Sequence, residues 1–226
     1  MKRKPPVNVA ASVRARLLKV SKERGEDFTL TLMNYAAERF LYRLSRSKFR
    51  DQFVLKGAML FAVRIGGRYR PTRDLDLLGT GEATEAAIDA AVRDIVTTAG
   101  DDDGVSFDLG SLQVHPIRED NRYGGIRAVM QAHLAEARIH LQIDVGFGDA
   151  ITPAAVDLEF PTLLADMPPP NVLAYRSGAL SREQVGRTLG LSFWETDAFL
   201  KARRAYLAYD EQDLRRDRRD LERLGC

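Results

Sequence analysis

Most apolar residues in the first hundred positions follow helical spacing. Val9, Val13 and Leu17 recur every four positions and predict a helix over residues 8–25, which Gly25 would end. The same spacing predicts helices over residues 28–46, 57–65 and 84–98. The N-terminal part of the chain is therefore expected to be mainly helical.

Beyond residue 104 the apolar positions alternate with polar ones, as they do in strands. Ile139, Leu141 and Ile143 would face one side of such a strand, and Gln142 and Asp144 the other. The acidic run at residues 101–104, just before this region, is expected to be a solvated turn. Strands are predicted over residues 73–78, 105–109, 111–117, 126–133 and 138–147, with the first and last in one sheet.

A run of prolines divides the chain near residue 170. Pro168, Pro169 and Pro170 suit neither a helix nor a central strand. Past them, helices in a helix-turn-helix pattern are predicted over residues 181–189 and 192–204, and Ser192 with Glu195 forms a capping-box sequence. The sequence thus predicts an α+β protein: residues 1–170 form a mixed sheet with N-terminal helices, and residues 171–226 form a small helical segment.

Charge is distributed unevenly over the 226 residues. Residues 1–50 contain 13 lysines and arginines against 4 acids, a net charge of +9, whereas the rest of the chain has a net charge of −7. A basic end beside an acidic body suits a polyanionic partner such as RNA, although a solvated helical face would show the same excess. The single cysteine, Cys226, and the absence of an apolar run of about 18 residues favour a cytoplasmic protein that does not span a membrane.

The candidate chemistry lies in a pair of acids spaced two apart. In the predicted strand, Asp74 and Asp76 point to the same face, and Asp144 in the last strand can join them. Clustered carboxylate oxygens are what Mg²⁺ selects, and three of them on a sheet suit two-metal nucleotidyl transfer. The alternative is that these are surface carboxylates paired with Arg70 and Arg73.

Basic residues and a glycine flank these acids. Gly57, at a predicted helix start, would offer bare backbone N–H groups to a phosphate. Lys56 could contact phosphate or merely extend along the surface. Arg73 could hold a triphosphate or neutralise the aspartates, and Asp149 could line the site or cap the next segment. The three histidines lack metal-ligand spacing, and no hydrolytic triad is evident.

Residues 8–170 resemble the AbiEii-type abortive-infection toxins, which are nucleotidyltransferases of type IV toxin–antitoxin systems. The resemblance implies a nucleotidyltransferase-like core in which Gly57 and Ala58 form the phosphate element and Asp74, Asp76 and Asp144 bind metal. It also implies Mg²⁺, a nucleoside triphosphate, a tRNA acceptor and a cognate antitoxin as partners. The matching stretches are residues 8–17 and 38–47, Phe53-Val54-Leu55-Lys56-Gly57-Ala58, residues 70–78, and Ile143-Asp144-Val145-Gly146-Phe147-Gly148-Asp149.

The chain departs from this family after residue 170. The family continues into a helical half with an Ala-Glu-Lys motif whose lysine serves the nucleotide site, and that motif is absent here. Residues 173–224 instead resemble a family of short antitoxin-like proteins with a helix-turn-helix pattern. Three interpretations stay open: an active enzyme, a catalytically crippled toxin core that acts as a binding or regulatory module, and a remnant without function.

Overall fold

The computed structural model describes residues 8–57, 59–60, 74–117, 125–147 and 155–175, together with Ser192 and Glu195. The chain divides into two compact units, Met1–Tyr175 and Arg176–Cys226, and the fold described below is that of the first unit. None of the described helices is long and apolar enough to cross a bilayer.

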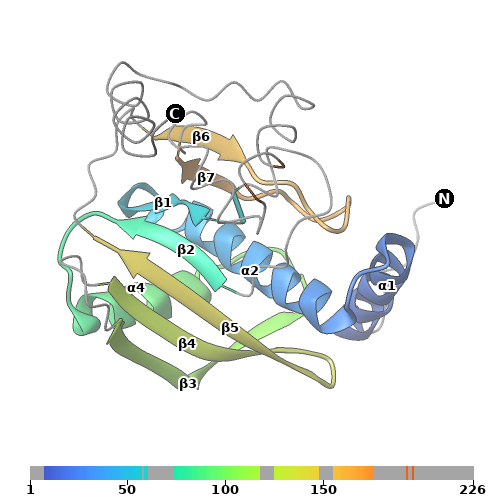
Figure 1. The fold of residues 1–226 in the computed structure, drawn as a ribbon. Coiled ribbons are helices and arrows are strands. Elements are labelled where there is room, and N and C mark those ends of the chain that lie inside the picture. Colours follow the sequence, from blue (N-terminus) through green and yellow to red (C-terminus); the bar gives the residue numbers. More distant parts are fainter. Residues whose placement is uncertain are drawn as a thin grey trace. The chain divides into compact units, whose positions relative to one another are not determined.

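Seven strands form one mixed sheet in the order β3-β4-β5-β2-β1-β7-β6 (Figure 1). The central pair, β2 and β5, is parallel, as is the pair of β1 and β7, and the other neighbours are antiparallel. This places the two predicted acidic strands side by side. The strands are β1 (Phe53–Leu55), β2 (Asp74–Gly79), β3 (Val105–Ile117), β4 (Gly125–Leu134), β5 (Ala137–Gly146), β6 (Val156–Glu159) and β7 (Asn171–Ala174).

Three α-helices begin at side chains that cap them. They are α1 (Val9–Arg24), α2 (Phe28–Arg46) and α4 (Glu85–Thr97), and a short 3₁₀ helix, η1, spans Arg50–Gln52. Asn8, Asp27 and Thr84 each accept a hydrogen bond from the backbone N–H three residues on, which satisfies one otherwise unpaired donor. Gly25 ends α1 in the left-handed region, with φ of 63°. The predicted bounds of these three helices are confirmed to within one residue at each end.

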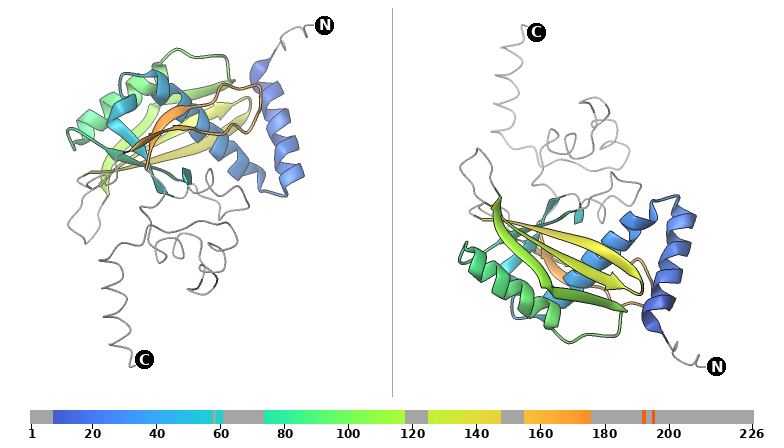
Figure 2. Two further views of the ribbon diagram at one scale, coloured as in Figure 1. Left: turned by 90° about the horizontal axis from the view of Figure 1, so that it is seen from above. Right: turned by 90° about the horizontal axis from the view of Figure 1, so that it is seen from below.

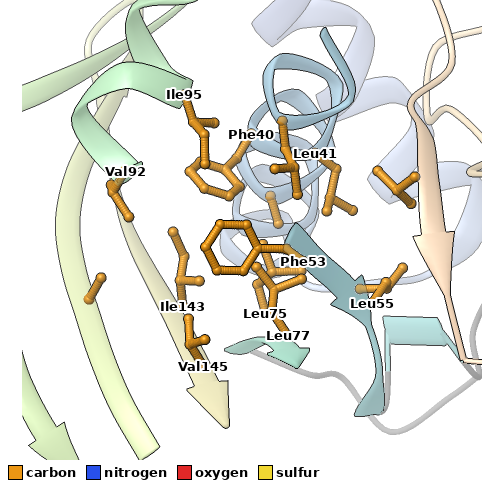
Figure 3. Packing of buried hydrophobic residues seen from close by; sticks show 14 of the residues in the cluster. Phe40, Leu41, Phe53, Leu55, Leu75, Leu77, Val92, Ile95, Ile143 and Val145 are labelled. Carbon is orange, nitrogen blue, oxygen red and sulfur yellow. The ribbon is translucent and has the colours of Figure 1, made fainter. Parts of the chain in front are cut away.

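One face of the sheet is packed against α2 and α4 (Figures 1 and 2). Leu75 and Leu77 of β2 and Ile143 of β5 point into this core, together with Phe40 of α2 and Ile95 of α4 (Figure 3). All five are at most 1 % exposed. Burying such side chains is the main favourable term in folding, at about 1.5–3 kcal/mol each. The opposite face of β2 and β5 is left for the polar residues.

Several predictions about strands were wrong. Residues 105–109 and 111–117 are one strand, β3, whose register with β4 shifts between Asp108 and Gln113. Strands β1, β6 and β7 were not predicted. Because β7 pairs with β1 and β6, residues 171–174 belong to the sheet rather than to a helical segment, and the unit boundary lies after Tyr175.

The acidic run before β3 is not simply a solvated turn, as predicted. Asp103 is only 3 % exposed, and its carboxylate accepts hydrogen bonds from Arg43 at 2.8 and 3.2 Å. Tyr35 donates to the Asp103 carbonyl. The partner that buries this acid lies 60 residues away in the sequence, on α2.

Other predicted elements fall partly or wholly outside the described residues. Gly57 is helical, as predicted, but residues 61–65 of that helix are not described, nor is the helix over 181–189. The capping box is confirmed: Glu195 accepts hydrogen bonds from the Ser192 N–H and hydroxyl at 2.8 and 2.6 Å.

A fully buried ion pair lies on α2. Arg39 donates to Glu38 at 2.6 Å, and both side chains are at most 1 % exposed. Glu38 also accepts from the Leu163 N–H at 2.7 Å, and Arg39 donates to the Pro168 carbonyl at 3.1 Å. Burial raises the pKa of Glu38 to about 7, against the opposing effects of Arg39 and the Leu163 N–H. The pair therefore joins α2 to the segment that leads into β7.

Candidate active site

The acids of β2 occupy the face that the sequence predicts. Asp74 and Asp76 are half-buried, whereas Leu75 and Leu77, which alternate with them, are 1 % exposed and lie in the core. Two-residue periodicity thus directs both carboxylates away from α2 and α4. Apolar burial of the leucines fixes this orientation, because a one-residue slip would reverse every side chain.

Parallel pairing brings the third predicted acid next to them. In the register of β2 with β5, Asp76 is the direct partner of Asp144, and Asp74 is the partner of Gln142. Side chains of directly paired residues lie about 5 Å apart at Cβ and project from the same face. The three predicted site aspartates are therefore neighbours on one face of two central strands.

Asp144 is held by an arginine that the sequence interpretation missed. Arg127 on β4 donates to both carboxylate oxygens, through Nε at 2.7 Å and Nη2 at 2.6 Å. Gln142 adds two longer contacts of 3.3 Å from Nε2. The Asp144 side chain is 17 % exposed and that of Arg127 is 34 % exposed, so the pair is partly shielded from water. A two-pronged contact of this kind is among the strongest that a carboxylate makes.

A signal for Arg127 was present in the sequence. Strands β4 and β5 are joined by the two residues Ala135 and Glu136, and this pairs Leu134 with Ala137. Counting back along both strands from that turn puts Arg127 opposite Asp144. Hairpin register alone would have found the pair.

Asp76 has an excess of negative charge around it. The pKa of Asp76 is raised to about 6, first by burial and then by the neighbouring Asp144 and Asp74, while Lys56 and Arg127 oppose the rise. Two acids beside a third that is partly desolvated repel one another unless a cation is added. A positive charge beside Asp76 would therefore favour its ionised form.

Gly57 packs directly against Asp76. Its φ is +72°, a conformation that favours glycine, and a Cβ there would lie 2.1 Å from Oδ2 of Asp76. Neither the backbone nor the space accepts a larger residue. The preceding residue, Lys56, donates its backbone N–H to the Asp76 carbonyl at 3.0 Å, so β1 delivers this turn to the acid.

The Lys56 ammonium group lies on the same side of the site. A Cβ at Gly146 of β5 would lie 2.7 Å from Nζ of Lys56, so this glycine leaves room for the lysine. Lys56 also lowers the pKa of Asp76 through its charge. The structure thus brings Lys56, Gly57 and the aspartates together, as predicted.

Part of the predicted site lies outside the described residues. Ala58, Arg70, Arg73 and Asp149 are among these positions, so their predicted roles stay predictions. Within the described part of the chain, no group of three or more His, Cys, Asp or Glu side chains is arranged to hold a metal ion.

The arrangement suits charge-dependent chemistry on an anionic substrate. Asp74 and Asp76 present carboxylate oxygens on one strand, and such hard oxygen donors are the kind that Mg²⁺ prefers. The side-chain-free backbone at Gly57 would let a phosphate approach closely, and Lys56 supplies a positive charge nearby. These parts match the requirements of phosphoryl or nucleotidyl transfer.

Two family models match the chain. Residues 39–180 match the family described as "Nucleotidyl transferase AbiEii toxin, Type IV TA system", which covers more than half of the chain. Residues 172–223 match an uncharacterised protein family, UPF0175. No curated protein matches the chain.

Two solved structures resemble the fold distantly. JHP933 from Helicobacter pylori is 12% identical, with a TM-score of 0.41, over 69% of this chain and 54% of that one. A candidate nucleotidyltransferase from H. pylori is 12% identical, with a TM-score of 0.42, over 69% of this chain and 56% of that one. The chain therefore spans about half the length of each of these structures.

Proposed function

The chain belongs to the family of AbiEii nucleotidyl transferase toxins of type IV toxin–antitoxin systems, and we propose that it transfers a nucleotide from a nucleoside triphosphate to an acceptor. The single observation that carries this proposal is the convergence of Asp74, Asp76 and Asp144 on adjacent strands, with Gly57 against Asp76. Nucleotidyl transfer needs little from the protein beyond positioning and charge stabilisation, and this set of residues supplies both.

Asp74 and Asp76 would hold Mg²⁺. When bound, the ion would neutralise charge on the triphosphate. The fit rests on the hard oxygen donors of the two acids and on the excess negative charge at Asp76. The backbone at Gly57 and the Lys56 ammonium would bind the phosphates, with Ala58 and Arg73 as predicted contributors.

The proposed reaction is a substitution at the α-phosphorus. An acceptor hydroxyl forms a new oxygen–phosphorus bond, the bond to the β-phosphate breaks, and pyrophosphate leaves with the electron pair. The hydroxyl proton passes to water. Asp144, whose two oxygens already accept from Arg127, would assist only through its negative charge.

We propose tRNA as the acceptor, because the N-terminal region favours a polyanion. Residues 1–50 have a net charge of +9 in the sequence, of which the structure pairs Arg39 with Glu38 and Arg43 with Asp103. On α1, Lys22 and Arg24 are exposed, and so is Arg46 at the end of α2. Exposed lysines and arginines contribute to nucleic-acid binding chiefly through phosphate contacts. A cognate antitoxin is the proposed protein partner, in keeping with the family.

The proposal is tested with nucleotides labelled at the α-phosphate, Mg²⁺ and total tRNA. Wild-type protein should label the RNA, and Asp74→Ala should not. Asp94→Ala is the matched control, because Asp94 is a partly exposed acid on α4 that pairs with Lys48, outside the site. Equal labelling by Asp74→Ala and wild type would overturn the proposal.

A second candidate is a binding or regulatory module that does not turn over. The observation that favours it is the second family match over residues 172–223, which overlaps the end of the first match at residue 180. The resemblance to AbiEii-type toxins implies an Ala-Glu-Lys motif beyond this point, and the sequence lacks it. Such a protein would retain nucleotide or a partner without transfer. Nucleotide binding by calorimetry with no label transfer to any RNA would favour this candidate over the enzyme.

A further inference from the structure

Arg127 supplies a positive charge at the position where a second metal ion would approach Asp144. Its Nε and Nη2 reach the two carboxylate oxygens at 2.7 and 2.6 Å, and Gln142 approaches both oxygens from the next position but one on β5. A carboxylate offers about four lone-pair sites in total. The described donors therefore leave Asp144 little capacity for a further ligand.

The pairing of Arg127 with Asp144 is imposed by the backbone. Ten consecutive residue pairs run along β4 and β5 from the two-residue turn, and Arg127 with Asp144 is one of them. Ile126 and Ala128, on either side of Arg127, are at most 5 % exposed and lie in the core. The arginine cannot turn away by a shift in register without exposing these residues.

Asp76 lacks such an arrangement. It is the direct partner of Asp144 on the neighbouring strand, yet no side chain in the described part of the chain donates a hydrogen bond to its carboxylate. Its close neighbour is the backbone of Gly57. Asp144 is thus already paired with the Arg127 guanidinium, whereas Lys56 acts on Asp76 through its charge.

We propose that Arg127 takes the place of one metal ion, so that this chain binds a single divalent cation, at Asp74 and Asp76, instead of two. The inference rests on the proposed function for the identity of the site. A second divalent ion at Asp144 would have to approach the Arg127 guanidinium, and two positive charges at that distance repel each other.

The number of bound ions tests the proposal without any turnover. Mn²⁺ binding is measured by electron paramagnetic resonance and by calorimetry on the full chain, for wild type, Arg127→Gln and Arg127→Lys. Wild type should bind about one Mn²⁺, and Arg127→Gln should bind about two, because the freed Asp144 becomes a ligand. Arg127→Lys, which keeps the charge, should remain near one.

Controls separate this inference from general damage and from the proposed function. Arg93→Gln removes an exposed arginine of α4 and should leave the count at one. About two Mn²⁺ on wild type, or the same count in wild type and Arg127→Gln, would overturn the inference. Failure of wild type to bind Mn²⁺ would overturn both proposals. Counts that change as expected without any label transfer would support Arg127's role and reject the enzymatic function.

Discussion

Two clusters of charge in this molecule differ in how completely they are neutralised. Glu38 and Arg39 on α2 are at most 1 % exposed and face each other at 2.6 Å. Asp74, Asp76 and Asp144 on the sheet are half-buried, and only Asp144 has a two-pronged cationic partner in the described residues. The first cluster is a buried pair of opposite charges, and the second places three carboxylates on one face of adjacent strands.

The difference separates a structural role from a functional one. The guanidinium of Arg39 also lies between the rings of Tyr35 and Tyr42, 5.6 and 5.2 Å from their centroids, so aromatic faces supplement its hydrogen bonds. Two of its nitrogens, Nε and Nη1, have no hydrogen-bond partner among the described residues, so the aromatic rings are their main contacts. On the sheet face, in contrast, we expect a bound cation to be stabilising, as in a binding site. The predictions below test this contrast.

Breaking the buried pair of opposite charges should have the largest effect. Arg39→Ala leaves Glu38 as a buried carboxylate without its counter-ion, and we expect a loss of about 3–5 kcal/mol in the free energy of unfolding. Urea denaturation followed by circular dichroism measures it. Arg46→Ala, which removes an exposed arginine near Tyr42, should cost less than about 1 kcal/mol. Equal losses for the two variants would contradict the contrast.

Neutralising one of the three carboxylates on the sheet should have the opposite effect on stability. Asp76→Asn removes a desolvated charge beside two like charges, so the metal-free protein should gain about 1–2 kcal/mol. Nucleotidyl transfer should fall by about 100-fold or more, because a ligand of the proposed ion is lost. Denaturation and label transfer are measured on the same preparations. Asp94→Asn should change neither, and a less stable Asp76→Asn would count against charge excess at this position.

Adding a methyl group beside Asp76 tests the close approach of the backbone. Gly57→Ala must both adopt a positive φ and displace the carboxylate, and we expect a loss of about 2 kcal/mol together with reduced transfer. Gly25→Ala is the matched control, since Gly25 also has a positive φ but would place its Cβ in open space. That variant should cost only about 1 kcal/mol and leave transfer unchanged. Unaltered transfer by Gly57→Ala would show that the approach is not needed.

The pH dependence of stability tests the protonation of Glu38 in the buried ion pair. The pKa of Glu38 is about 7 in the folded protein against 4.5 ordinarily, so the folded state binds the proton more tightly. Its contribution to stability is present below about pH 4.5 and is lost as pH rises toward about 7. We expect a decline of about 1–2 kcal/mol over that interval, discounted for the Arg39 pair.

The pH experiment is best done on proteins that carry Asp76→Asn, because Asp76 is a second acid with a raised pKa. Asp76 contributes with the same sign. Unfolding curves of Asp76→Asn and of the double variant Asp76→Asn/Glu38→Gln should therefore be compared between pH 4 and pH 8. The free energy of unfolding of Asp76→Asn minus that of the double variant should decrease, and can change sign, as pH rises. A pH-independent difference would mean that Glu38 keeps its ordinary affinity for protons.

The smallest expected effect concerns the turn that carries the sheet face. Ala135 has a φ of 51°, which an alanine adopts only at a cost. Ala135→Gly should raise the free energy of unfolding by about 0.5–1 kcal/mol without changing transfer or the metal count. Thermal denaturation measures the gain. A change in metal binding would instead indicate that the turn alters the site.

The helices and the acidic face could be predicted because each has a local signal. Capping side chains mark the starts of α1, α2 and α4, and alternation of Asp74 and Asp76 with buried leucines fixes their direction. Strands β1, β6 and β7 were missed because they have only 3, 4 and 4 residues. A strand that short is too brief to show an alternation of apolar and polar residues. Their place in the sheet depends on partners far away in the sequence.

The missed charge pairs have a similar cause. Asp103 is buried by Arg43, and no local pattern links two residues that lie 60 positions apart. Arg127 is different, since the hairpin count determines its partner once the two-residue turn is accepted. The sequence interpretation therefore missed Arg127 because it did not extend the β4–β5 register from the turn as far as Asp144.

The length of the turn between β4 and β5 sets which residue of β4 lies opposite Asp144. Asp144 is eight residues from Glu136, about 26 Å along an extended strand, yet the length of that turn decides which side chain stands across from the acid. Loop tips generally accept insertions. Lengthening this one by a single residue would put an aliphatic side chain where the guanidinium now stands, so tolerance to insertion should end here while neighbouring loops still allow it.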